Sequence, residues 1–201
     1  MKVLVACECS GRVREAFRTR GHDAWSVDLV PSEQPSPYHV QCDVTEVLAD
    51  GWDLLIAHPP CQYLALSGIH WNNRIAGRSS HTDAALAFVR TLLMAPIAKI
   101  ALENPVGVIS SRIRKWDQKI QPWEYGHAES KLTCLWLKGL PPLLPTRVLT
   151  PTRFQTNGRP QWDNQTPSGQ NKLGPSPQRA AERARTYQGI ADAMAAQWGT
   201  V

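Results

Sequence analysis

The chain has 201 residues, 42% of them hydrophobic, which is enough for one α/β core but short for two independent domains, so we expect a single domain over residues 1–201. No stretch approaches the roughly 18 consecutive apolar residues of a membrane-spanning helix, and the N-terminus becomes polar too early for a signal peptide, so we expect a cytoplasmic protein with no membrane partner. The net charge is +5, but residues 1–50 hold five basic and eight acidic side chains, so the basic excess lies in the later part of the chain and suits a polyanionic partner.

Short strands and helices alternate in the first part of the chain. Apolar runs predict strands at 2–7 and 23–28, with a helix between them that Gly21 closes. Residues 30–39 are a loop by composition, residues 40–44 are a short third strand, and WDLLIA at 52–57 is a buried fourth strand.

The second part continues this alternation up to about residue 138. Residues 82–95 have helical periodicity with Thr82 as the N-cap, and a buried strand follows at 98–104. Residues 117–138 predict two strands in an antiparallel edge hairpin. Residues 141–178 form a loop-rich insert, and a last helix covers about 177–198. The fold class is therefore α/β, with a mostly parallel sheet, helices on both faces and ligands beyond the carboxyl ends of the strands.

Two reactive side chains follow neighbouring buried strands. In HPPCQYLALSG, residues 58–68, the two prolines keep the chain extended, so Cys61 is presented rather than packed. Glu103 lies at the end of the next strand. A thiolate can attack an electron-poor carbon, and a carboxylic acid can protonate a ring nitrogen. Methylation of cytosine at carbon 5 needs both, because carbon 5 becomes nucleophilic only after a group has added to carbon 6.

The remaining cysteines predict neither disulfides nor metal binding. The five cysteines are scattered, odd in number and without a secretory signal, so we expect reduced thiols. Cys7 and Cys9 form a CxC pair, but no matching second pair accompanies it, and we expect no metal site.

Several segments, in order, resemble the DNA (cytosine-5-)-methyltransferase family. DLLIAHPPCQYLALSG resembles its nucleophile motif, and ALENPVG resembles its ENV motif with Pro105 in place of valine. ACECSGRVREAF stands where the family has its glycine-rich S-adenosylmethionine loop, and YGHAESKLT is similar to its YGxxQxRxR stretch. The order and approximate spacing agree over residues 1–138. The resemblance implies a Rossmann-like S-adenosylmethionine-dependent methyltransferase fold.

The resemblance also implies roles for individual residues. Cys61 would be the nucleophile, Glu103 the acid at ring nitrogen 3, and Lys131 would take the place of the first arginine of QxRxR. The implied cofactor residues bind S-adenosylmethionine and are Cys9, Ser10, Gly11, Asp28, Asp43 and Pro59. The implied substrate residues are Pro60, Gln62, Ser67, Arg74, Asn104, Thr133 and Arg153.

The sequence departs from the family pattern at several of these positions. Thr133 replaces the second arginine and leaves open which group supports the carbonyl oxygen of the base, while Glu129 replaces the glutamine. The glycine loop keeps only Gly11. Asp28 and Asp43 are as readily helix caps as ligands, and the TYQGIADAM match near the C-terminus rests on Gly189. His58 is interpreted as structural or as a support for the reactive groups.

Electrostatic requirements follow from the implied chemistry. A free thiol is mostly protonated at neutral pH, so Cys61 needs help to ionise, from strand-end amides, Lys131 or the substrate. Glu103 should be buried with a raised pKa in order to donate a proton.

The insert stands where the family has a sizeable target recognition domain. This predicts a compact, phage-type member acting in a bacterial or phage-infected cell, with a short or relaxed sequence context, and a monomer is favoured. The expected partner is double-stranded DNA with a flipped cytosine. Phe154 or Trp162 would fill the space that the base leaves in the duplex. A polar loop spanning His70 to Arg78 would close over DNA. The candidates for binding phosphates are Arg147, Arg153, Arg159 and Lys172.

Other functions stay open at this point. The chain could be a catalytically silent DNA-binding or inhibitory protein on a decayed methyltransferase fold, or a methyltransferase acting on free cytidine nucleotides or single-stranded DNA. An amino-methyltransferase is disfavoured because HPPC lacks the polar head and the aromatic residue of (D/N/S)PP(Y/F/W). A zinc deaminase is disfavoured because PCQYL lacks the second cysteine of PCxxC.

Overall fold

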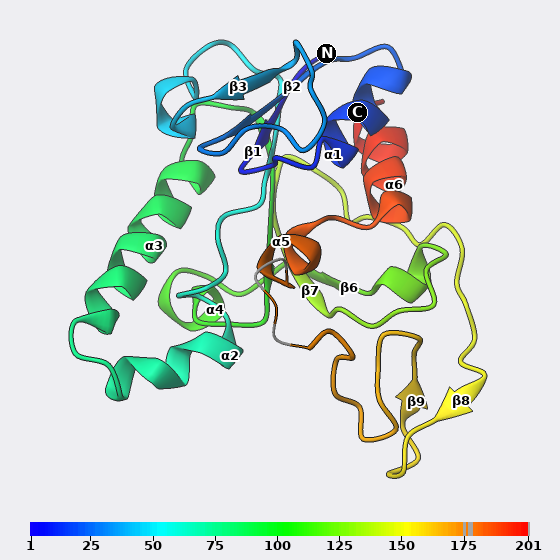
Figure 1. The fold of residues 1–201 in the computed structure, drawn as a ribbon. Helices are drawn as coiled ribbons and strands as arrows, with labels where there is room; N and C mark the ends of the chain where they lie inside the picture. Colours follow the sequence, from blue (N-terminus) through cyan, green and yellow to red (C-terminus); the bar gives the residue numbers. More distant parts are fainter. Residues whose placement is uncertain (175, 177–178, 201) are drawn as a thin grey trace.

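A computed structural model describes residues 1–174, 176 and 179–200. Its centre is a seven-stranded sheet with the order β3-β2-β1-β4-β5-β7-β6 and helices on both faces (Figure 1). The strands are β1 (Lys2–Ala6), β2 (Asp23–Asp28), β3 (His39–Gln41), β4 (Leu54–Ala57), β5 (Lys99–Pro105), β6 (Gln118–Ile120) and β7 (Thr133–Lys138). The first five in the sheet are parallel, and β7 runs antiparallel to both β5 and β6. This architecture confirms the predicted fold class.

Two apolar cores lie on opposite faces of the sheet. Val5 and Ile56 belong to the face covered by α1 (Arg12–Thr19) and α6 (Gln188–Trp198), which pack side by side (Figure 1). Leu4 and Leu55 belong to the opposite face, under α3 (Arg78–Leu93). Because successive strand residues point to opposite faces, central strands buried on both sides read as continuous apolar runs.

The remaining elements are short. Two α-helices, α2 (Leu66–Ile69) and α4 (Ile109–Arg112), follow the carboxyl ends of β4 and β5, and α5 (Arg179–Ala184) precedes α6. Three 3-10 helices cover Val44–Glu46, His70–Asn73 and Pro122–Glu124. A separate two-stranded sheet, β8 (Arg153–Phe154) and β9 (Pro160–Gln161), lies in the insert, away from the main sheet (Figure 1). None of the described helices is long and apolar enough to cross a membrane.

The beginning of α3 differs from the sequence prediction. The helix begins at Arg78 after Gly77, whose φ of 75° favours glycine, and Thr82 lies buried inside it. The Thr82 hydroxyl donates to the carbonyl of Tyr63 at 3.1 Å and accepts from Asn72 at 2.9 Å. Thr82 was predicted as the N-cap, which is wrong, because its hydroxyl is used in tertiary contacts.

Two other element boundaries also differ. The predicted last helix is two helices, because residues 185–187 are not helical, and its predicted first residues, 177 and 178, lie outside the described residues. The third strand ends at Gln41, since only three residues pair with β2 at the edge of the sheet. Asp43 then caps a 3-10 helix and turns the chain away.

Candidate active site

The nucleophile segment leaves the sheet at the carboxyl end of β4. The His58 amide still donates to the carbonyl of Ala6 at 3.0 Å, so pairing with β1 extends one residue beyond the strand. After the two prolines the chain turns, because the amides of Leu64 and Ala65 donate to the carbonyl of Cys61 at 3.0 and 2.9 Å. Cys61 is exposed at this turn, as the sequence predicted.

Glu103 reaches the same place from β5. Ala57 of β4 pairs with Leu102 of β5, so the next residues along each strand, His58 and Glu103, are also neighbours. His58 Nδ1 lies 2.8 Å from Glu103 Oε2, and the two side chains are only 9% and 12% exposed. This buried contact was missed at the sequence level, although strand alternation places both residues on the α1 and α6 face.

The ionisation of Glu103 differs from the sequence prediction. Burial raises the pKa of Glu103, but the hydrogen bond from His58 and the positive charge of Lys131 outweigh it, so the pKa lies below its ordinary value. The prediction of a raised pKa is wrong, because it considered burial and neither partner. Glu103 is therefore a carboxylate at neutral pH.

Cys61 has the opposite shift. Although the residue is exposed at the turn, the surrounding protein removes part of the water around the thiol, which raises its pKa. The Glu103 carboxylate raises this pKa further, while Lys131 and Arg183 lower it in part. The thiol is therefore protonated at neutral pH. Because the Glu103 carboxylate affects the pKa of Cys61, the two predicted catalytic groups lie in one site.

Lys131 and Thr133 lie beside Glu103 at the beginning of β7. The Lys131 ammonium donates to the carbonyl of Arg185 at 3.4 Å, and its amide donates to Gln121 at 3.0 Å. Thr133 is buried, its hydroxyl donates to the carbonyl of Lys131 at 3.0 Å, and it helps to lower the pKa of Glu103. Lys131 thus supplies positive charge at the site, whereas Thr133 is uncharged and contributes only a hydroxyl group.

Asn104 fixes the nucleophile segment to β5. Its side chain is buried, and Nδ2 donates to the carbonyl of Pro59 at 2.8 Å. Pro59 is itself buried, whereas Pro60 and Gln62 are exposed. The predicted contacts of Asn104 with substrate and of Pro59 with cofactor remain predictions.

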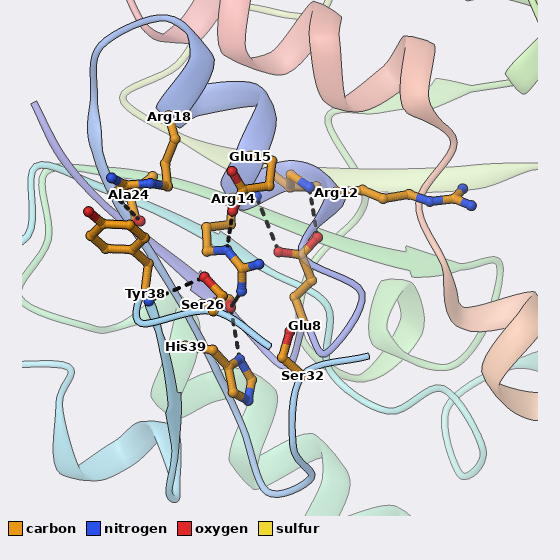
Figure 2. A network of polar contacts seen from close by, with 12 residues as sticks. Glu8, Arg12, Arg14, Glu15, Arg18, Ala24, Ser26, Ser32, Tyr38 and His39 are labelled. Atoms are coloured by element: carbon orange, nitrogen blue, oxygen red, sulfur yellow. Dashed lines mark hydrogen bonds and ion pairs between the residues drawn. The ribbon is translucent and has the colours of Figure 1, made fainter. Parts of the chain in front are cut away.

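Glu8 organises the predicted cofactor loop between β1 and α1 (Figure 2). Its buried carboxylate accepts from the amides of Val13 at 2.7 Å and Arg14 at 3.2 Å and from the Ser10 hydroxyl at 3.2 Å, which caps the beginning of α1. Gly11 has φ 73°, and a Cβ there would lie 2.4 Å from Nη2 of Arg14. The loop therefore requires glycine at this one position, and Cys9 and Ser10 lie half-buried beside it.

A buried relay of polar groups supports the same loop (Figure 2). Arg14 donates to the Ser26 hydroxyl at 2.7 Å, which lies 2.9 Å from His39 Nδ1, and His39 Nε2 lies 3.0 Å from the carbonyl of Val30. Because Nε2 must donate to a carbonyl, Nδ1 accepts from Ser26. The relay joins α1, β2, β3 and the loop after β2.

The two predicted cofactor acids follow β2 and β3. Asp28 is half-buried, and its Oδ1 accepts from the Val30 amide at 3.2 Å. Asp43 Oδ1 accepts from the amide and hydroxyl of Thr45 at 2.9 and 2.8 Å, which lowers the pKa of Asp43. Asp43 is thus an N-cap, the alternative that the sequence left open. Cofactor binding by Asp28 and Asp43 remains a prediction.

Residues 185–187, which we call the strap, cross the carboxyl edge of the sheet. Arg185 forms an ion pair with Glu33 in the loop after β2 at 2.9 Å. The carbonyl of Thr186 accepts from Arg12 at the beginning of α1 at 2.9 Å. The strap therefore joins the predicted cofactor loop and the loop after β2, and it contacts Lys131 near the predicted catalytic residues.

The end of the strap and the beginning of α6 fit tightly against the stretch that precedes β7. The Tyr187 hydroxyl donates to Glu129 at 2.5 Å, and the Gly189 amide donates to His127 Nε2 at 2.9 Å. A Cβ on Gly189 would lie 2.0 Å from the carbonyl oxygen of Tyr125. Only glycine allows α6 to begin so close to this backbone.

The predicted loop after the nucleophile is largely helical. Ser67 is exposed in α2, and residues 70–73 form a 3-10 helix. Arg78 donates to the carbonyl of Gln62 at 3.2 Å, and the Arg74 guanidinium lies 5.4 Å from the centre of the exposed Trp71 ring. The prediction of a loop is wrong here, while its role in covering DNA remains a prediction.

A cavity of about 440 Å³ lies beside this segment, between it, α3 and α4. Its lining includes His70, Asn72, Asn73, Ser111 and Arg112. Neither Cys61 nor Glu103 lines it, so this cavity is separate from the catalytic pair.

The insert exposes one aromatic ring and buries the other. Phe154 on β8 is 62% exposed, next to Arg153, which pairs with Asp163. Trp162 is buried and stacks parallel to Trp123 at 5.5 Å between ring centres. The prediction that Trp162 could fill the space of an extruded base is therefore wrong, while Phe154 keeps that possibility.

Among the described residues, no group of three or more His, Cys, Asp or Glu side chains is placed to hold a metal ion.

Comparison with known proteins finds a distant structural likeness. No family model and no curated protein matches the chain. A solved E. coli structure, described as a candidate DNA modification methyltransferase encoded within a prophage, is 17% identical with a TM-score of 0.49. The match covers 77% of this chain and 56% of the other, so this chain spans about half the length of that protein. A likeness of this size carries no conclusion about activity.

Proposed function

We propose that this protein is a DNA methyltransferase that transfers a methyl group from S-adenosylmethionine to carbon 5 of cytosine. The observation that carries the proposal is the position of Cys61 and Glu103 at the carboxyl edge of the paired strands β4 and β5, where Asn104 binds the carbonyl of Pro59 and the Glu103 carboxylate raises the pKa of the Cys61 thiol. A thiol and a carboxyl group acting on one heterocycle supply the nucleophile and the acid that this reaction requires.

The carboxyl edge also offers groups that fit the methyl donor, which supplies an electrophilic methyl group when bound. Glu8 binds the Ser10 hydroxyl and the Arg14 amide, and the Arg14 side chain packs beside Gly11, so both residues support the loop of Cys9, Ser10 and Gly11. Asp28 ends β2 with a half-buried carboxylate suited to hydroxyl donors. We assign Asp43 and Pro59 to the donor site on the family resemblance.

The opposite pKa shifts give the first step a proton balance. When Sγ of Cys61 bonds to carbon 6, its proton passes to the Glu103 carboxylate and from there to ring nitrogen 3. Carbon 5 thereby becomes nucleophilic and takes the methyl group, whose bond to the sulfonium sulfur of the donor would break and leave that sulfur as a neutral thioether. Carbon 5 then loses its proton to water, the proton on nitrogen 3 returns through Glu103 to sulfur, and the bond from sulfur to carbon 6 breaks. The thiol and the carboxylate are restored.

Lys131 is the group that we assign to the carbonyl oxygen of the base. Its positive charge lowers the pKa of both Cys61 and Glu103, whereas Arg183 acts on Cys61. Its ammonium group would offset negative charge on the ring as sulfur adds. Thr133 then serves the site by holding the carbonyl of Lys131.

DNA would lie along the basic and exposed residues around this edge. The target base must leave the duplex at a cost of a few kcal/mol, which phosphate contacts from Arg74 and Arg153 would offset. Pro60, Gln62 and Ser67 are exposed on the nucleophile side and are assigned to the substrate. Because the described part of the insert holds only a two-stranded sheet, we expect a short recognition sequence.

Mass spectrometry of nucleosides tests this proposal. DNA from cells that express the protein, in a bacterial host without its own cytosine methylation, should contain 5-methylcytosine. Cys61→Ala should abolish it while circular dichroism shows an unchanged fold, because no other group replaces the sulfur. Cys42→Ala, a half-buried cysteine that follows β3, is the matched control and should keep activity. Full activity of Cys61→Ala would refute the mechanism.

A second candidate substrate is a free cytidine nucleotide or a single strand, favoured by the small size of the insert. Raising the salt concentration separates the two, because binding to duplex DNA weakens steeply with ionic strength and binding to a mononucleotide does not. A catalytically silent DNA-binding protein need not bind the donor, so calorimetry with S-adenosylmethionine tests that alternative.

A further inference from the structure

His58 has a buried nitrogen with no partner. Its backbone is fixed to β1 through Ala6, and its Nδ1 is fixed to Glu103 Oε2 at 2.8 Å. The side chain is 9% exposed, and Nε2 meets no hydrogen-bond partner among the described residues. A buried polar atom without a hydrogen-bond partner lowers the stability of the fold by about 1–3 kcal/mol. Such an atom beside candidate catalytic residues therefore needs a functional explanation.

The neighbouring charges determine which nitrogen carries the proton. Glu103 is a carboxylate, so its oxygen accepts, and Nδ1 of His58 must donate. The lowered pKa of Glu103 supports this assignment. With the ring proton on Nδ1, the lone pair of the ring lies on Nε2, which needs a donor. The other groups acting on the catalytic pair are Cys61, Lys131 and Arg183, and none of them donates to Nε2.

We propose that Nε2 of His58 accepts a hydrogen bond from the exocyclic amino group of the target cytosine. This inference rests on the proposed function. If Glu103 acts on ring nitrogen 3, the amino group on the adjacent carbon is the N–H nearest to the imidazole that Glu103 holds. Cytosine presents a donor there.

The arrangement makes His58 a residue that determines specificity. Uracil and thymine carry a carbonyl oxygen where cytosine has its amino group, and two acceptors would then face each other. A site built to pair with an N–H rejects an analogue that lacks it, because its own acceptor is left unsatisfied.

Two substitutions distinguish the roles of the two ring nitrogens of His58. In His58→Asn the amide reaches the position of Nδ1, so the contact with Glu103 is kept and the acceptor at Nε2 is removed. In His58→Gln the amide reaches the position of Nε2, so the acceptor is kept. Both variants are assayed with duplexes carrying either cytosine or 2-pyrimidinone, which lacks the amino group, at the target position. The readout is the ratio of kcat/KM for the two bases.

The expected change is a fall in that ratio for His58→Asn. The intrinsic reactivity of each base is the same in every assay and cancels between variants. Loss of one buried hydrogen bond should lower the preference for cytosine by at least about fivefold in His58→Asn relative to the wild type. His58→Gln should keep most of the preference although its kcat falls.

Different outcomes overturn different statements. An unchanged ratio in His58→Asn overturns the role of His58 and leaves cytosine methylation standing. Absence of 5-methylcytosine in the wild type overturns the proposed function and this inference with it. If His58→Asn does not fold, ¹⁵N NMR of the free wild-type protein decides, since a proton on Nε2 and none on Nδ1 contradicts the inference whatever the activity.

Discussion

At the scale of single residues, the proton shared between the two predicted catalytic groups lies on the sulfur of Cys61 rather than on the carboxylate of Glu103. Cys61 is a thiol with a raised pKa, and Glu103 is a carboxylate with a lowered one. The sequence predicted both residues and their common edge, because each follows a buried strand. It could not predict their ionisation, because that depends on His58 and Lys131, which reach Glu103 only through strand pairing.

The reactivity of Cys61 towards iodoacetamide should report this coupling. At pH 7.5 the Cys61 thiol should react more slowly than a cysteine in an unstructured peptide, by about tenfold for each unit by which its pKa is raised. Glu103→Gln should speed the reaction, because it removes a negative charge that disfavours the thiolate. Lys131→Met should slow it, because it removes a positive charge. Mass spectrometry of the Cys61 peptide over time gives the rate.

Cys42 in the same digest serves as the internal control. Its pKa is raised by burial and by neighbouring acids other than Glu103, so its rate should not respond to either substitution. Equal rates for Cys61 in wild type and Glu103→Gln would contradict the coupling.

At the scale of elements, the beginning of α6 depends on one glycine. Alanine is better than glycine inside a helix by about 1 kcal/mol, so helix propensity predicts that Gly189→Ala stabilises the protein. The contact of a new Cβ with the Tyr125 carbonyl predicts the opposite, since 2.0 Å is impossible without moving backbone.

We expect the contact to prevail. Gly189→Ala should destabilise the fold by about 1–3 kcal/mol, which lowers the Tm by about 2–4 °C per kcal/mol for a chain of this size. Thermal unfolding followed by circular dichroism measures it. Gly174→Ala is the control, because nothing lies within 4 Å of a Cβ there and φ is not positive. A higher Tm for Gly189→Ala would show that α6 can shift away from the Tyr125 carbonyl without loss of stability.

Helix boundaries were the least predictable feature at this scale. Periodicity identified α3, but Gly77 and the tertiary contacts of Thr82 decide where it begins. The apolar spacing of the last helix continues through the strap, and the interruption follows from the contacts of Arg185 and Thr186 with residues far away in the chain. Local sequence carries no signal for contacts of that kind.

At the scale of the whole molecule, the basic excess of the later part should determine binding to DNA. Arg159 and Lys172 are exposed in the insert, and removal of a side chain that binds one phosphate should reduce the slope of log K against log salt by about 0.9. The double variant Arg159→Ala and Lys172→Ala should therefore reduce the slope by about 2 for duplex DNA. Fluorescence anisotropy at several salt concentrations measures it.

Arg20→Ala is the matched control for charge. Arg20 is exposed after the last turn of α1, at the opposite edge of the sheet from Cys61. Its loss should leave the slope unchanged. A slope that falls equally in both variants would mean that DNA binds without regard to the proposed face.

The alternation of strands and helices was sufficient to predict the parallel sheet, its two covered faces and its antiparallel edge. Burial on both faces makes β1, β4 and β5 visible as apolar runs. The insert was predictable only as irregular chain. Trp162 stacks on Trp123, which lies outside the insert, and β8 and β9 are two residues long each, too short to show a strand pattern.

The strap has a consequence for biosynthesis. The ribosome delivers Arg12 and Glu33 early, but their partners Thr186 and Arg185 emerge only after the whole sheet has been made. Until then the loop beside Cys9 lacks its outer support. A chain that stops before the strap would therefore carry the proposed donor loop without these two contacts.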